Sequence, residues 1–207
     1  TNLVGGAGTV YNANNVNVTY AKIDGGTSSP GYFTDVKNKP STFAEDSWTT
    51  IASSVKAGNT RGYKVGETKT IDMGTYGTHT LRIANTSTPN ECSTSGFSQT
   101  ACGFVLEFAD IITTYKRNNS NPNKGGWPVT RMRTFVNNDI YNAIPSEIKN
   151  AIIDTIVVSS HGSTSGEANF TSTDKLYLLS TAEVWAEGSS NQIGKYDTAR
   201  DVTRQLD

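Results

Sequence analysis

The chain has 207 residues, of which 35% are hydrophobic, and it carries 18 basic against 19 acidic side chains. A chain of this length can bury about 70% of its unfolded surface, enough for one domain with an extension or for two small domains. Its net charge of −1 argues against a nucleic-acid partner, and it has no run of about 18 apolar residues that would predict a membrane span.

The first 46 residues are poor in charge and rich in Asn, Gly, Ser and Thr. Within them Val16, Val18 and Tyr20 alternate with smaller or polar residues, which is typical of a strand with one apolar face. We therefore predict a β-rich N-terminal extension over residues 1–46, followed by an α+β surface domain over residues 47–207. A lone strand is unstable, so residues 1–24 are expected to pair with the main domain or with a neighbouring molecule.

Local signals mark the next two elements. Ser47 is a good N-cap for a short amphipathic helix that Gly58 ends. Residues 69–73 and 78–83 alternate in polarity on either side of a glycine-containing turn, which predicts a β-hairpin.

The two cysteines, Cys92 and Cys102, flank a short loop of Ser, Thr and Gly residues. This loop is flexible enough to let the sulfurs meet, so we predict a disulfide worth roughly 3 kcal/mol in the chain-entropy model. A disulfide implies an oxidising compartment, whereas two buried thiols remain the alternative. Two cysteines and two distant histidines do not make a metal site, and we expect no metal and no cofactor.

The second half of the chain predicts an alternation of strands and helices. Residues 103–109 form a strand candidate, extended toward residue 115. A helix then starts near Pro128, because its apolar residues follow the 3.6-residue period: Val129, Met132, Phe135, Val136 and Ile140. Pro145 opens a second short helix, with inward residues Ile148, Ile152 and Ile153.

Three further elements complete the prediction. Residues 175–179 read as a strand, Ser180 caps a short helix, and residues 197–207 form a final helix. Together these elements predict the α+β class, with an antiparallel sheet and two or three short helices.

No residue pattern predicts catalysis. His79 lies in a strand and is expected to be a half-exposed cross-strand partner, while His161 stands in a serine-rich loop without a nucleophile elbow. A glycosidase needs two facing carboxylates, and Glu107 is expected to point to solvent. Loop oxygens at residues 89–91 leave a calcium ion open as an alternative. We predict no catalytic residues and no enzyme.

Aromatic side chains in or beside polar loops are the stronger binding signal. Tyr76, Trp127 and Tyr196 are the candidate ligand-binding residues, because such rings can stack on sugars or join protein interfaces. The alternative for each ring is that it pins its loop onto the core.

Four segments carry a family resemblance: residues 66–74, 80–85, 133–142 and 173–179. Through them the stretch from Gly62 to Asp207 resembles a bacterial family of uncharacterised domains found in surface and secreted proteins. That family is distantly similar to C-type-lectin-like domains and has no established catalytic residues. Its members usually continue into a Trp-Trp-Leu-Arg-Ser strand, which this chain lacks, so the C-terminal edge is expected to be completed by another segment or chain.

The resemblance implies an extracellular, cell-surface protein of bacteria. The expected function is non-catalytic recognition or adhesion, with a protein or glycan on a surface as the partner. The alternative is a structural subunit of a surface filament or assembly, joined through strand pairing at residues 1–24 or at the C-terminal edge. A hydrolase acting on glycans is the third alternative.

Overall fold

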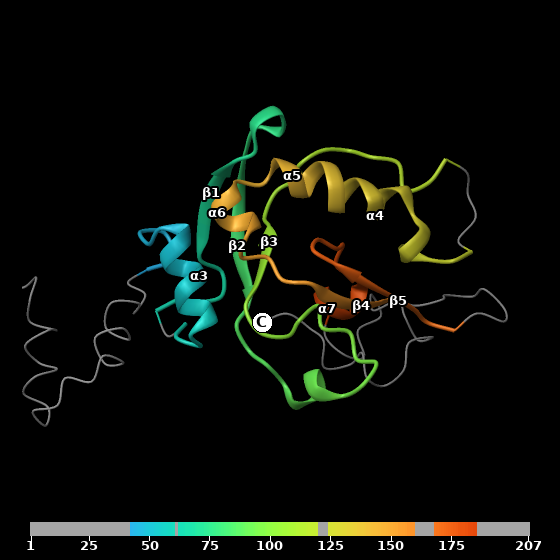
Figure 1. Ribbon diagram of the computed structural model, residues 1–207, viewed down its shortest axis with the longest axis horizontal. Helices are drawn as coiled ribbons and strands as arrows, with labels where there is room; N and C mark the ends of the chain where they lie inside the picture. Colours follow the sequence, from blue (N-terminus) through green and yellow to red (C-terminus); the bar gives the residue numbers. More distant parts are fainter. Residues whose placement is uncertain (1–41, 61, 120–123, 160–167, 186–207) are drawn as a thin grey trace, which may run out of the picture. The chain divides into compact units, whose positions relative to one another are not determined.

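The computed structural model describes residues 42–60, 62–119, 124–159 and 168–185 (Figure 1). The chain divides into two compact units, Thr1–Gly62 and Tyr63–Asp207, and each is described by itself. The strand predicted around residues 16–20 and the final helix predicted over residues 197–207 lie outside the described residues. The predicted boundary between residues 46 and 47 stays a prediction.

The described part of the first unit is built on helix α3, Trp48–Lys56. Its N-cap is Ser47, as predicted, since the Ser47 Oγ accepts the backbone N–H of Thr50 at 3.1 Å. Trp48 packs edge-to-face on Phe43, with ring centroids 5.6 Å apart. The helix stops before Gly58, which adopts a left-handed φ of +70°.

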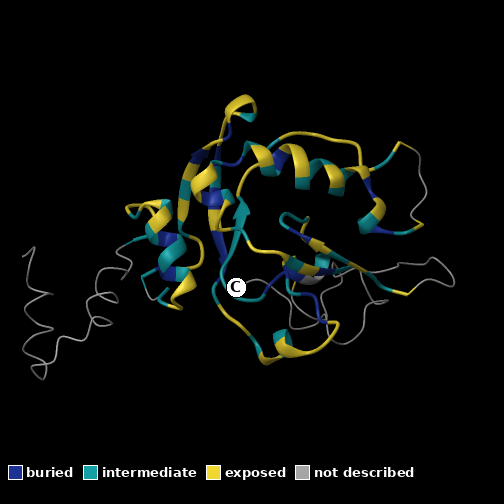
Figure 2. Ribbon diagram, viewed as in Figure 1, coloured by how far each residue is buried: buried dark blue, intermediate teal, exposed yellow. Residues whose placement is uncertain are grey.

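The second unit begins with a three-stranded antiparallel sheet in the order β1-β2-β3. Its strands are β1 (Thr68–Asp72), β2 (Thr78–Asn85) and β3 (Val105–Phe108), and a 3₁₀ turn, η1 (Gly74–Tyr76), joins the first two. The predicted hairpin is thus confirmed. Figure 2 shows buried residues along β1 and β2, where the core side chains include Ile71, Leu81 and Ile83.

Strand β3 is shorter than predicted. It ends at Phe108, and only Ala109 adds one more backbone bond, to the carbonyl oxygen of Thr80 at 2.8 Å. The side chain of Asp110 then accepts the Thr80 N–H, which a longer strand would have bonded through its backbone. Glu107 was expected to point to solvent, but it forms an ion pair with Arg82 across β2 and β3 and is only 19% exposed.

The predicted disulfide between Cys92 and Cys102 is confirmed, with their Cα atoms 5.9 Å apart. The loop that it closes begins with η2, Asn90–Ser93. A second set of contacts also holds the ends of this region together. The buried side-chain nitrogen of Asn85 lies 2.7–3.2 Å from the carbonyl oxygens of Ser87, Ala101 and Gly103. The segment between β2 and β3 is therefore fastened both covalently and by a buried side chain.

Among the described residues, the longest helix spans residues 131–143 and has 13 residues. It combines α4 (Arg131–Phe135), a π-helical turn η4 (Val136–Ile140) and α5 (Tyr141–Ala143). It starts later than predicted, because Thr130 is the N-cap and its hydroxyl accepts the Arg133 N–H at 3.1 Å. The residues around Pro128 form a separate 3₁₀ turn instead, η3 (Trp127–Val129).

Helix α6, Ser146–Lys149, follows Pro145 as predicted and buries Ile148. The inward placement predicted for Ile153 is wrong, since this side chain is 74% exposed. The chain leaves the helix after Lys149, so the helical spacing from Ile148 no longer decides which way residue 153 points.

The second sheet has two antiparallel strands, β4 (Thr155–Ser159) and β5 (Phe170–Asp174). Helix α7, Thr181–Val184, follows with a capping box between Ser180 and Glu183, which confirms the predicted cap.

The strand predicted over residues 175–179 is wrong, because the Oδ1 of Asn137 accepts the N–H groups of both Lys175 and Leu176, at 2.9 and 3.0 Å. Successive N–H groups of a strand point in opposite directions and cannot reach one oxygen. The side chain of Asn137, on the 13-residue helix, therefore prevents the strand from continuing past Asp174.

The α+β class is confirmed, with two small antiparallel sheets in place of the single sheet predicted. None of the helices in the described ranges combines the length and the apolar composition that crossing a membrane requires.

Close packing of Phe170 on Gly126 yields a first stability prediction. Gly126 is buried with φ +52° and ψ −150°, and a Cβ at this position would collide with the Phe170 ring. Gly77 has a similar backbone, φ +86° and ψ −167°, but its Cβ would meet open space. We expect Gly77→Ala to cost about 1–3 kcal/mol through backbone strain alone. Gly126→Ala should lower the free energy of unfolding by about 1–3 kcal/mol more than Gly77→Ala does, because the added methyl group overpacks against Phe170. Urea titrations in which the two variants lost equal stability would contradict this prediction.

Candidate functional site

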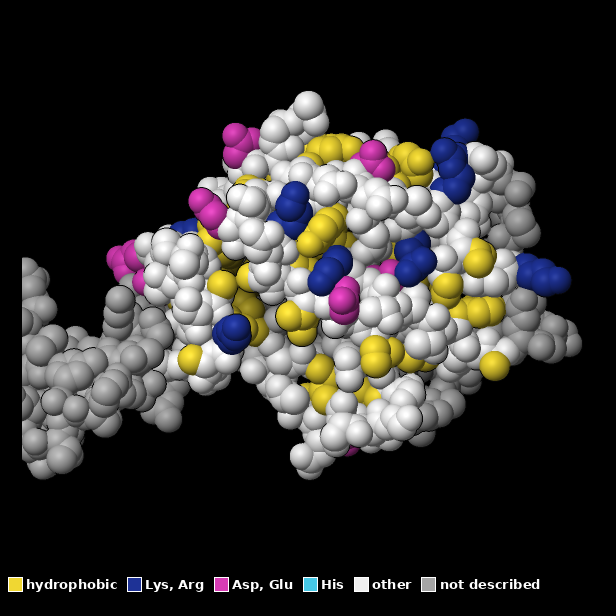
Figure 3. Space-filling model, in the orientation of Figure 1, with side chains coloured by type: hydrophobic (Ala, Val, Ile, Leu, Met, Phe, Trp, Pro, Cys, Tyr) yellow, Lys and Arg dark blue, Asp and Glu magenta, His cyan; other side chains and the backbone are white. Residues whose placement is uncertain are grey.

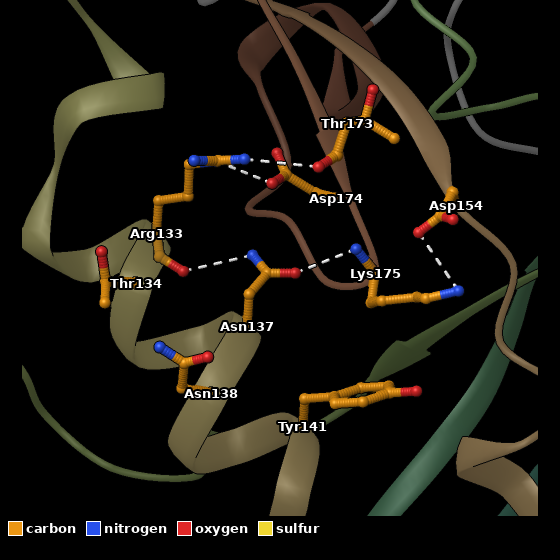
Figure 4. A pocket seen from close by; sticks show the side chains of 9 residues that line it. All are labelled: Arg133, Thr134, Asn137, Asn138, Tyr141, Asp154, Thr173, Asp174 and Lys175. Carbon is orange, nitrogen blue, oxygen red and sulfur yellow. Dashed lines mark hydrogen bonds and ion pairs between the residues drawn. The ribbon is translucent and has the colours of Figure 1, made fainter.

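A shallow pocket of about 270 Å³ lies between the 13-residue helix and the end of β5 (Figure 4). Its lining residues are polar or amphipathic and come from the helix, from β5 and the residue after it, and from the residue before β4: Arg133, Thr134, Asn137, Asn138, Tyr141, Asp154, Thr173, Asp174 and Lys175.

Asp174 is the buried centre of this region, with 1% of its side chain exposed. One carboxylate oxygen accepts Arg133 Nε–H at 2.7 Å, and the other accepts Trp127 Nε1–H at 2.9 Å and the Ser172 hydroxyl at 2.7 Å. Strand alternation explains the geometry, because Ser172 and Asp174 project from the same face of β5. Three donors thus hold one carboxylate and join η3, α4 and β5.

Asn137 forms a second junction between the helix and the chain after β5. Besides accepting two backbone N–H groups, its amide nitrogen donates to the carbonyl oxygens of Leu176 at 2.8 Å and Arg133 at 3.2 Å. Asn137 lies in the π-helical turn η4, whose hydrogen bonds enclose one residue more than an α-turn. Such turns occur often at functional sites.

The far wall of the pocket is fixed by charged and aromatic side chains. Lys175 Nζ lies 3.1 Å from Asp154 Oδ1 and donates to the carbonyl oxygen of Ile152 at 3.1 Å. The Tyr141 hydroxyl donates to the carbonyl oxygen of Lys149 at 3.2 Å, which sets the direction in which this side chain projects.

Two side chains at the rim remain available. Thr134 and Asn138 are exposed and lie four residues apart, on one face of the helix. Neither side chain makes a hydrogen bond within the part of the chain that the structure describes, and Figure 4 draws none for them.

The predicted ligand-binding aromatics lie elsewhere. Tyr76 is half-buried and packs edge-on against Phe135, with centroids 6.4 Å apart, while Trp127 is held by Asp174. Phe135 also stacks on Tyr115, with ring centroids 4.0 Å apart. The rings of Tyr76 and Tyr115 therefore both pack against the helix through Phe135. Neither Tyr76 nor Trp127 lines the pocket, and Tyr196 lies outside the described residues. Their role in ligand binding stays a prediction.

His79 was expected to be half-exposed, but it is buried, with 7% of its surface accessible. Its Nδ1 lies 2.6 Å from the carboxylate of Asp110 and its Nε2 lies 2.8 Å from the carbonyl oxygen of Tyr76. The hydrogen bond to Asp110 raises the pKa of His79, and the backbone N–H of Thr80 together with His79 lowers the pKa of Asp110. Both ring nitrogens face acceptors, so a protonated imidazole fits this place and neither nitrogen is left for a substrate.

This pair predicts a pH-dependent stability. Folding raises the pKa of His79 above its ordinary 6.5, so its contribution is complete below that pH and is lost as the pH rises through the folded pKa. The pKa of Asp110 is lowered below 3.8, so its contribution is lost only as the pH falls through that folded pKa. Melting temperatures of the wild type and His79→Gln should differ most between about pH 4 and pH 6.5, and the difference should shrink as the pH rises above that range. A difference that is constant with pH would contradict the assignment.

A second buried carboxylate, Glu183, lies outside the pocket, where it accepts the Thr100 hydroxyl and the Ser180 N–H. The Tyr177 hydroxyl donates to the carbonyl oxygen of Thr100 at 2.8 Å, and burial together with the nearby Glu183 raises the pKa of Tyr177 well above its usual range. These bonds join α7 to the loop before β3 and serve packing.

Metal binding and surface charge add no further site within the described ranges. No three His, Cys, Asp or Glu side chains there gather in a way that could hold a metal ion. On the face drawn in Figure 3, Lys and Arg side chains are scattered among polar surface, in keeping with the net charge of −1.

The pocket was not predicted from the sequence. One signal could have found it, because Arg133, Asn137 and Tyr141 recur every four residues and therefore share a polar stripe on the helix. The burial of Asp174 had no such signal, since its partners lie far away in the sequence.

Residues 104–206 match the model of a family described as a domain of unknown function (DUF6273). No curated protein and no solved structure matches the chain significantly. The matched range contains every residue that lines the pocket, whereas the β1–β2 hairpin and the disulfide precede it.

Proposed function

We propose that this chain is an extracellular, non-catalytic recognition or adhesion module of a bacterial surface protein, with a protein or glycan as its partner. The polar pocket carries the proposal. Its rim offers uncommitted hydrogen-bonding groups at Thr134 and Asn138, on a framework held by Arg133, Asn137 and Asp174. A framework held in this way reduces the entropy that is lost when a ligand binds.

The extracellular location is supported by the Cys92–Cys102 disulfide, because disulfides persist in oxidising compartments and are rare in the cytosol. It also rests on the resemblance to a family of domains in surface and secreted proteins. That family is distantly similar to C-type-lectin-like domains. From this similarity we propose only the mode of action, which is binding of a ligand without a chemical reaction.

A non-catalytic role is supported by the state of the ionisable groups. In the pocket Arg133 is paired with Asp174, and Lys175 is paired with Asp154. A general base needs a lone pair that can reach the substrate, and both nitrogens of His79 already face acceptors.

The proposal is tested by retention of the chain on an array of immobilised glycans and on host-cell surfaces. The double variant Thr134→Ala/Asn138→Ala should lose at least about tenfold in affinity, since two hydrogen bonds of roughly 1 kcal/mol each are removed. Asn142→Ala is the matched control, because Asn142 is exposed on the same helix and does not line the pocket. Equal retention of all three proteins, or release of sugar from a bound glycan, would overturn the proposal.

A structural role through strand pairing is the second candidate, and the outer edge of β5 favours it. The carbonyl of Ile156 and the N–H of Val158 bond to residues 98–99, so they point away from β5. Their partners in the antiparallel register, Thr173 and Thr171, then point away from β4. Among the described residues, no hydrogen bond is formed by the backbone of Thr171 at this edge.

The open edge is short, because Arg133 Nη2 donates to the carbonyl oxygen of Thr173 at 3.3 Å. A residue that caps an edge limits strand addition there, which makes recognition the better-supported function. Size-exclusion chromatography distinguishes the two. Assembly through β5 predicts that Thr171→Pro removes higher-order species, and pairing through the N-terminal segment predicts the same for deletion of residues 1–24.

A further inference from the structure

The charges in the pocket are balanced in pairs. The guanidinium of Arg133 contacts the buried Asp174 at 2.7 Å, and its other two nitrogens donate to the carbonyl oxygens of Pro128 and Thr173. The ammonium of Lys175 contacts Asp154 and a backbone carbonyl. A charged ligand would have to separate one of these pairs before it gained a partner of its own.

The groups left over at the pocket are neutral or acceptors. The Asn138 amide and the Thr134 hydroxyl each donate and accept hydrogen bonds. Asp154 uses one carboxylate oxygen for Lys175 and is 65% exposed, so its second oxygen can accept from a ligand hydroxyl. This set complements neighbouring hydroxyl groups, each of which is also donor and acceptor.

Tyr141 adds an apolar surface to this polar set. Its ring lines the pocket, and the hydrogen bond from its hydroxyl to the backbone of Lys149 sets the direction in which the side chain projects. An aromatic side chain whose position is set in this way packs well against a flat ligand face, because less side-chain freedom is lost on binding. The pocket volume of about 270 Å³ lies below the range of about 300–1,000 Å³ that holds drug-sized ligands, so one small ring suits it.

We infer that the pocket binds a single neutral sugar ring of a glycan, with its hydroxyl groups bonded to Thr134, Asn138 and Asp154 and with Tyr141 against its apolar face. The inference rests on the proposed function and names the ligand class of the same site. A charged sugar and a peptide are the competing ligands.

NMR titration of the intact chain tests this assignment. The neutral probes are glucose, galactose, mannose and N-acetylglucosamine, and the charged probes are glucuronic acid and glucosamine. At least one neutral probe should shift amide signals of residues 133–141, with an affinity that changes less than about twofold between 0.05 and 0.5 M salt. Tyr141→Leu and Thr134→Ala/Asn138→Ala should each weaken it at least about tenfold, whereas Asn142→Ala should not.

The outcomes separate this inference from the proposed function. Binding of a charged probe alone, no shift with any neutral probe, or shifts that persist in the pocket variants would overturn the sugar assignment. If surface retention still depends on Thr134 and Asn138 but only a peptide competes for it, the recognition function stands and the sugar inference fails. If surface retention is unchanged when Thr134 and Asn138 are substituted, the recognition function at this pocket is overturned.

Discussion

Asp174→Ala is expected to lower the free energy of unfolding by about 3–5 kcal/mol, because removing one partner of a buried ion pair leaves the other without compensation. The variant loses more than the ion pair with Arg133, since the Trp127 indole N–H and the Ser172 hydroxyl lose their acceptor as well. The variant should therefore unfold at a much lower urea concentration than the wild type.

Asp154→Ala is the matched control for this experiment. Asp154 also forms an ion pair at the pocket, with Lys175, but 65% of its side chain is exposed. Exposed pairs contribute about 0–1 kcal/mol. If the two variants lost equal stability, Asp174 would not be the centre that joins the helix to β5.

Removal of the disulfide is the second change that is expected to lower the stability strongly. The double variant Cys92→Ser/Cys102→Ser should lose roughly 3 kcal/mol in the chain-entropy model, because its unfolded state regains the freedom of the closed loop. The Asn85 contacts should persist, so the variant is expected to fold with the same β2–β3 pairing.

Reduction of the wild type supplies the control for the disulfide. Urea titration of the reduced and alkylated wild type should reproduce the loss seen in the double variant, since both proteins lack the same cross-link. A loss of less than about 1 kcal/mol in both would show that the Asn85 contacts alone hold this segment.

If neutral sugars bind as inferred, binding and stability should separate cleanly in this chain. Thr134 and Asn138 are exposed and make no side-chain hydrogen bonds within the described ranges, so substituting them should leave the melting temperature almost unchanged. Asp174 and Asn137, in contrast, join the helix to β5 and to the chain after it, so their loss should reduce binding by weakening the fold.

The sequence by itself determined the features whose causes lie within about ten residues. Ser47 caps α3, the glycine turn sets the β1–β2 hairpin, Ser180 and Glu183 form a capping box, and the spacing of Cys92 and Cys102 allowed the disulfide. Each of these rests on a local preference that acts before the rest of the chain is in place.

Where the backbone or side-chain partners of a segment are distant in the sequence, only the tertiary structure decided its conformation and burial. The apolar run after Asp174 suits a strand, yet Asn137, 38 residues away, takes the N–H of Lys175 and ends it. His79 alternates like an exposed strand residue, yet Asp110, 31 residues on, lets it be buried.

The candidate site belongs to this second kind. Among the residues that line or support the pocket, only Trp127 was predicted to be a site residue, and for a different role. Arg133 and Asp174 are 41 residues apart, and a carboxylate becomes a buried centre only when distant donors converge on it. Such convergence leaves no periodic signal in the sequence, because burial of a charged group is decided by partners that the fold supplies.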